Sequence, residues 1–238
     1  PWPLWRQAKM ASLSSPPLPP IEERLPLSPL EIYLLSAFLP LWLLVYYRVV
    51  LSPATGRPDG FDSSTVSNLH SVPLCILASL SLLEVIPEVV PLFWSLSFFV
   101  ADLIDCVTRR DGPFFVHAII SLALNIMARG NARHRLLKSI SKGCLTEAST
   151  PFLNHWKKSR SYGSFVIFFL AFTLSRMVWV PLFVHRSYVV HLSGELDYMI
   201  WPSVAYYLLQ MAWYTKMCSM VVNYKLPKEM KEKMEKEQ

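Results

Sequence analysis

The chain has few charged side chains. Aspartate, glutamate, lysine and arginine make up 17% of its 238 residues, whereas ordinary soluble chains carry roughly 25%. Hydrophobic residues reach 53% and aromatic residues 13%. This composition argues against one or two soluble domains, which the length alone would allow.

Metal and nucleic-acid signals are also absent. The four cysteines (Cys75, Cys106, Cys144 and Cys218) are scattered, with no CxxC and no zinc-like spacing, so the sequence predicts no metal site and no cofactor. The net charge of +6 comes without a groove-reading module, which argues against nucleic-acid binding. The basic residues sit at the ends of apolar runs and between them, as topology signals and headgroup contacts do.

Long apolar runs recur along the chain. Five of them approach the roughly 20 residues that cross a bilayer, namely 32–51, 66–86, 92–107, 165–184 and 198–222. A sixth, 113–127, needs tilting or lengthening into its flanks. The runs predict an all-α polytopic membrane protein, with six spans by hydropathy alone.

Residues 129–156 are too polar for hydropathy to identify a span there. They include Arg129, Arg133, Arg135, Lys138, Lys142 and Glu147. A loop, an interfacial helix and a seventh, buried helix all remain open, and the distribution of basic residues tolerates both six and seven spans.

The two tails differ from the membrane region, 30–223. Residues 1–29 contain eight prolines, which exclude a helix and favour an extended polyproline II tail. This tail starts without Met, as expected of a processed organelle-targeted precursor or of part of a longer protein. Residues 224–238 alternate Lys, Glu and Met, a pattern typical of a short solvated or interfacial helix. Either tail is a candidate contact for other membrane subunits.

Helical periodicity gathers the scattered polar residues into stripes. The stripes are His70, Ser81 and Glu84; Ser95, Asp102 and Cys106; His117, Ser121 and Asn125; Thr173 and Arg176; and Ser203, Tyr207, Gln210 and Tyr214. Five such helices suggest a ring whose polar stripes face a shared interior. Serines of this kind often form hydrogen bonds between helices, each of which stabilises the bundle by about 0.6 kcal/mol. Ionisable groups cost more, so Asp102, Glu147 and Arg176 indicate a cavity or a buried ion pair, such as Asp102 with Arg176.

The most informative segment is 147–156, which begins Glu147-Ala-Ser-Thr-Pro-Phe-Leu-Asn154. It places a carboxylate, two hydroxyls and an amide beside membrane-length helices. Unpaired polar groups cost several kcal/mol in hydrocarbon, so the segment predicts a functional interior.

The chain resembles the TLC-domain family, named for TRAM, LAG1 and CLN8 proteins. The resemblance rests on an ordered series of segments: 66–71 with His70, 97–103 with Asp102, 114–118 with His117, the E-x-S-T-P-F-L-N run at 147–154, and 168–176 with Arg176. It covers roughly residues 30–222. In this family the fold is a six-helix membrane barrel around a lipid-accepting cavity, commonly with one extra helix. The resemblance therefore favours seven helices here, with 134–151 as a buried one.

The resemblance and the polar stripes together give a set of candidate site residues. Those expected to line a lipid cavity are His70, Asp102, His117, Ser121, Asn125, Glu147, Ser149, Thr150, Asn154, Arg176, Gln210 and Tyr214. Ceramide synthases of the family carry two adjacent histidines in the fourth helix, but here Val116 and Ala118 flank His117. That departure weakens the case for an acyltransferase, although a single imidazole oriented by Asp102 could still act as base or nucleophile.

Three functions follow as alternatives. The first is a non-catalytic protein that binds, senses or adjusts membrane lipids. The second is an accessory scaffold subunit of a large organellar membrane complex. The third is an acyl-CoA-dependent N-acyltransferase resembling ceramide synthase, with His117 as base and Asp102 orienting it. The family resemblance suggests the endoplasmic reticulum or another endomembrane, and the tail leaves a mitochondrial or plastid inner membrane open.

Overall fold

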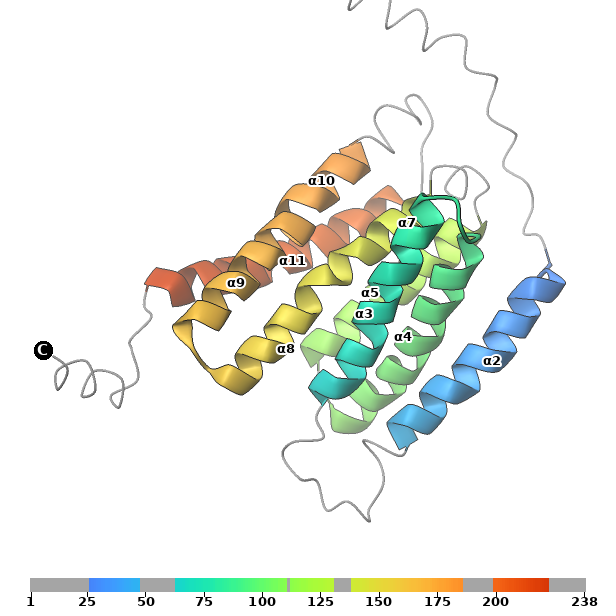
Figure 1. Ribbon diagram of the computed structural model, residues 1–238, viewed down its shortest axis with the longest axis horizontal. Coiled ribbons are helices and arrows are strands. Elements are labelled where there is room, and N and C mark those ends of the chain that lie inside the picture. The colour runs from blue at the N-terminus through green and yellow to red at the C-terminus, as the bar shows by residue number, and fades with distance from the viewer. Residues whose placement is uncertain (1–25, 48–62, 111, 131–137, 186–198, 223–238) are drawn as a thin grey trace, which may run out of the picture.

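The protein is a bundle of seven helical columns, as seen in a computed structural model that describes residues 26–47, 63–110, 112–130, 138–185 and 199–222 (Figure 1). The columns are α2 (Pro29–Tyr46), α3 (Ser63–Leu82), α4 (Val89–Arg109), α5 (Gly112–Gly130), α7–η3–α8 (Ser139–Cys144, Leu145–Ser149 and Thr150–Ser159), α9–η4–α10 (Tyr162–Phe172, Thr173–Val178 and Trp179–Val184) and α11 (Ile200–Val222). Most of the proline-rich tail, 1–29, and all of the charged arm, 224–238, lie outside the described residues.

Five columns in the described residues are long and apolar enough to cross a membrane: α2, α3, α4, α5 and α9–η4–α10. The short run at 113–127 is lengthened at both ends into the 19-residue α5. Helix α11 has 23 residues, but Gln210 and Lys216 reduce its hydropathy. The prediction of an all-α polytopic membrane protein is confirmed.

The polar stretch forms the seventh column. It begins at Ser139 and continues to Ser159, whereas the resemblance suggested 134–151, part of which lies outside the described residues. Pro151 does not break it, because it falls in the first turn of α8, where its missing N–H has no helical partner. The column ends at Arg160, which adopts the left-handed conformation with φ 52° typical of helix C-termini.

Contacts with the end of α3 and with the α3–α4 connection hold the start of this column. Lys138 Nζ donates to Ser81 O (2.9 Å) and to Glu84 Oε1 (3.2 Å), and Ser141 N donates to Glu88 Oε1 (3.0 Å). The Glu88 carboxylate thereby satisfies one of the N–H groups that a helix leaves open in its first turn. Periodicity predicted that Glu84 belongs to the polar stripe of α3 with His70 and Ser81, but this prediction is wrong. The helix ends two residues earlier, and Glu84 turns outward with φ 64°.

Six columns close into a ring, in the order α3, α4, α5, α11, α9–η4–α10 and α7–η3–α8, which returns to α3. Helix α2 packs against α4 outside this ring (Figure 1). The arrangement agrees with a six-helix barrel plus one extra helix.

Polar contacts attach α2 near both of its ends. At the N-terminus, Ser28 and Glu31 form a capping box, and Glu31 Oε1 also accepts from Arg129 Nε of α5 at 3.0 Å. At the other end, the Tyr46 hydroxyl donates to Asp102 Oδ1 of α4 at 2.9 Å.

Replacing Tyr46 by phenylalanine is expected to lower the free energy of unfolding by about 1–2 kcal/mol, because the bond to the Asp102 carboxylate is lost in a low-dielectric contact. Thermal unfolding in detergent measures the change. Tyr33→Phe is the matched control, since Tyr33 lies on the same helix and is 70% exposed; it should change stability by less than about 0.5 kcal/mol. Equal shifts for the two variants would contradict a stabilising role for the Tyr46–Asp102 bond.

Candidate functional site

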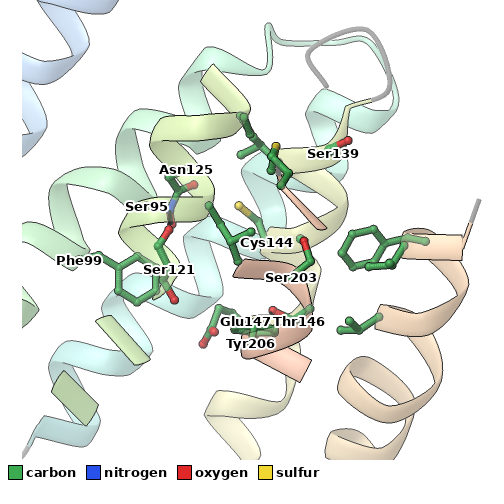
Figure 2. A pocket seen from close by; sticks show the side chains of 18 of the residues that line it. Ser95, Phe99, Ser121, Asn125, Ser139, Cys144, Thr146, Glu147, Ser203 and Tyr206 are labelled. Atoms are coloured by element: carbon green, nitrogen blue, oxygen red, sulfur yellow. Dashed lines mark hydrogen bonds between the residues drawn. The ribbon is translucent and has the colours of Figure 1, made fainter. Parts of the chain in front are cut away.

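A pocket of about 90 Å³ lies inside the ring, between α4, α5, α7–η3, α10 and α11 (Figure 2). One side of it is apolar and includes Val180, Phe183 and Val184 of α10. The polar side chains come from the other walls and are Ser95, Ser121, Asn125, Ser139, Thr146, Glu147, Ser203 and Tyr206. The pocket is therefore amphipathic.

The wall formed by α4 and α5 is a fixed hydrogen-bonding surface. Asn125 Nδ2 donates to Ser121 O at 2.9 Å and to Ser95 Oγ at 3.4 Å. Because a backbone carbonyl can only accept, these bonds orient the amide. Asn125 and Ser121 are one turn apart on α5 and both are buried, as their four-residue spacing predicted.

Glu147, which lines the pocket, forms a buried ion pair with Arg176. Arg176 Nη2 lies 3.3 Å from Glu147 Oε1, and the two residues are 5% and 9% exposed. Glu147 Oε2 also accepts from the Thr150 hydroxyl at 2.7 Å. Glu147 lines the pocket, and its charge is neutralised by the guanidinium next to it.

Arg176 joins three columns of the ring. Its Nε donates to Thr146 O and to Ser149 Oγ (3.1 Å each), and its Nη1 donates to Gln210 Oε1 of α11 (2.8 Å). Arg176 lies in η4, a π-helical turn, and such turns occur frequently at functional sites. Sequence periodicity suggested Asp102 as a possible partner, but the ion pair in the structure is with Glu147.

His117 lies beside the pocket in an aromatic environment. Its ring is 5.6 Å from Phe99, 5.6 Å from Trp213 and 5.9 Å from Tyr206, measured between ring centroids. Its Nδ1 is buried and has no hydrogen bond within the described residues. Phe99 and Tyr206 also line the pocket, whereas His117 itself does not.

His70 lies further from the pocket, stacked on Phe98 with ring centroids 3.6 Å apart. Trp42 of α2 and Phe99 complete an aromatic environment around it. Among the described residues, no three His, Cys, Asp or Glu side chains gather closely enough to hold a metal ion.

The remaining candidates from the sequence fall into two groups. Ser149, Thr150 and Gln210 belong to the network around Arg176. Asp102, Asn154 and Tyr214 make contacts between helices: Asp102 with Tyr46, Asn154 Nδ2 with Asn68 Oδ1 at 2.6 Å, and Tyr214 with the stacked rings of Phe169 and Phe172. Of the predicted cavity residues, Ser121, Asn125 and Glu147 line the pocket itself.

Thr146 and Tyr206 are among the pocket residues that were not predicted. They share a hydrogen bond of 3.0 Å between their hydroxyls, and both line the pocket. Tyr206 lies four residues before Gln210, so helical periodicity could have identified it. Thr146 lies in the 3₁₀ turn η3, where the α-helical period does not apply.

These features define an all-α polytopic membrane protein whose helices surround an amphipathic pocket. The TLC domain, the domain of TRAM, LAG1 and CLN8 proteins, matches residues 60–223. The chain therefore belongs to the TLC-domain family. The match contains all six columns of the ring and begins after α2, so α2 is the additional helix. Membership indicates a function related to membrane lipids. No curated protein and no solved structure matches the chain.

Proposed function

We propose that this protein binds a membrane lipid in the amphipathic pocket and acts in lipid sensing or homeostasis without catalysing a reaction. The pocket carries this proposal, because it combines the apolar α10 wall with hydrogen-bonding groups on the facing walls. Lipid sites need both, an apolar surface for a chain and a few placed polar groups for orientation.

The environment of His117 supports a non-catalytic role. A general base must come within hydrogen-bond reach of the group that it deprotonates. Here the imidazole is 8% exposed and lies among three aromatic rings. The Asp102 carboxylate accepts from Tyr46 in the contact between α2 and α4, where it strengthens the fold.

Filling the pocket tests the proposal. Gly143 lines it, and a Cβ added at this position meets no atom within 4 Å. A leucine there would occupy ligand space without displacing the helices. Gly143→Leu should weaken lipid binding about tenfold to a hundredfold, because overpacking costs about 1–3 kcal/mol. Native mass spectrometry of purified protein measures the retained lipid.

Gly163→Leu provides the matched control. Gly163 is exposed in the first turn of α9, and a Cβ there also meets nothing within 4 Å. Both substitutions improve helix propensity by up to about 1 kcal/mol, so a difference between them reports on the pocket. Equal lipid retention by both variants would refute the proposed site. Acyl transfer from acyl-CoA to a long-chain base by the wild-type protein would show instead that the protein is an enzyme.

A further inference from the structure

The charges around the pocket restrict the headgroup that it can accept. Glu147 is the one acidic residue among its described lining residues, which include no lysine, arginine or histidine. An anionic headgroup would therefore meet a carboxylate and no cation in the lining of the pocket. In a low-dielectric interior, such a charge carries a large desolvation cost.

Arg176 does not supply the missing cation, because it does not line the pocket and four of its five N–H groups are engaged. The single Nε N–H is shared by Thr146 O and Ser149 Oγ, one N–H of Nη1 donates to Gln210, and Nη2 donates to Glu147 and Thr150. Moving it toward a phosphate would break the pair with Glu147 and leave a buried carboxylate without compensation.

Two lining residues, Asn125 and Glu147, offer only acceptors to a ligand, whereas the hydroxyls of the polar walls can donate or accept. The side-chain nitrogen of Asn125 is bound to Ser95 and Ser121, which leaves its Oδ1 as the group that can accept. Glu147 is ionised next to Arg176 and can only accept. A headgroup that donates hydrogen bonds can pair with both of these acceptors, whereas an ester or a phosphate can use the wall hydroxyls but brings no donor to Asn125 and Glu147.

We infer that the pocket selects an uncharged lipid whose headgroup donates hydrogen bonds, such as an alcohol or an amide. This inference rests on the proposed lipid-binding function and specifies its ligand class. The volume of about 90 Å³ agrees with a small headgroup, because pockets that enclose a drug-sized ligand measure about 300–1,000 Å³.

Three probes with the same oleoyl chain test the inference. 1-Monooleoylglycerol is neutral and donates two hydroxyl bonds, methyl oleate is neutral and donates none, and 1-oleoyl lysophosphatidic acid is anionic. Dissociation constants are measured by native mass spectrometry on the full chain in detergent. Monooleoylglycerol should bind at least about tenfold more tightly than either of the other two. Lipid can also bind elsewhere on the protein, so each probe is measured on both leucine variants. Binding that is lost in Gly143→Leu but kept in Gly163→Leu is counted as binding in the pocket.

The outcomes separate the inference from the function on which it rests. Pocket binding of lysophosphatidic acid as tight as that of monooleoylglycerol overturns the charge argument, and equal binding of methyl oleate overturns the donor argument. In both cases the protein remains a lipid binder. If none of the three probes shows binding that depends on Gly143, the ligand class and the lipid-binding function both fail.

A variant provides a second measurement. Asn125→Leu removes the acceptor at similar volume and should weaken monooleoylglycerol binding about threefold to tenfold, while methyl oleate binding stays within about twofold. Parallel losses for both probes would show that Asn125 supports the wall without contacting a headgroup.

Discussion

Replacing Arg176 by methionine is expected to destabilise the protein by about 3–5 kcal/mol, because Glu147 then stays buried with an uncompensated charge. Arg176 is 5% exposed, and its hydrogen bonds connect its own column, α9–η4–α10, to the α7–η3–α8 column and to α11. The loss would therefore loosen three columns of the ring together. Thermal unfolding followed by size-exclusion chromatography in mild detergent measures it.

A double-mutant cycle assigns the cost to the ion pair. Glu147→Gln alone should also be strongly destabilising, because it leaves Arg176 without its counter-charge. The loss of stability in the double variant should be at least about 1.5 kcal/mol smaller than the sum of the two single losses. The reason is that the double variant leaves no buried charge without a partner. Additive losses within about 0.5 kcal/mol would mean that the two residues act independently.

The exposed pair between Lys138 and Glu84 is the control for this cycle. Its atoms are 3.2 Å apart, similar to the buried pair, but the Glu84 side chain is 83% exposed. Glu84→Gln, which leaves the bond from Lys138 to Ser81 in place, should therefore cost less than about 1 kcal/mol. A cost as large as that of Glu147→Gln would show that burial does not explain the difference between the two pairs.

Hydropathy predicted six of the seven helical columns and the family resemblance added the seventh, but neither predicted which residues would pair across columns. Period and hydropathy identified the polar stripes, and His117, Ser121 and Asn125 are indeed buried together on α5. A stripe gives the direction of a side chain around its own helix. It does not say which residue of another column lies opposite. Asp102 was therefore a candidate ion-pair partner of Arg176, although the partner in the structure is Glu147.

The width of a stripe explains the other differences. An inward face covers about 100° of a helix or more, so residues at its edges meet the neighbouring column before they reach the centre. Asn154 contacts Asn68 and Tyr214 contacts Phe169 for this reason. The departures of η3 and η4 from α-helical geometry also change the direction of Thr146 and Arg176. Those turns depend on packing between columns, and the periodicity of one helix carries no information about that packing.

Helix α2 lies outside the matched TLC domain, and Trp42 is its main anchor. Trp42 is 2% exposed and makes edge-to-face contacts with Trp94 and Phe98 of α4 at 5.1 Å each, and with His70 of α3 at 5.9 Å. Between membrane helices, such packing replaces the hydrophobic effect as the main cohesive force. The position of α2 therefore depends on this side chain more than on its apolar outer face.

Trp42→Ala is expected to cost about 3 kcal/mol or more, because it opens a large cavity in the contact between α2 and α4. Trp201→Ala is the matched control on α11, where the indole is 66% exposed; its cost should stay below about 1 kcal/mol. The midpoint of thermal unfolding in detergent measures both. If the two variants unfold at the same temperature, Trp42 does not anchor α2, and the polar contacts of Glu31 and Tyr46 must hold the helix in place.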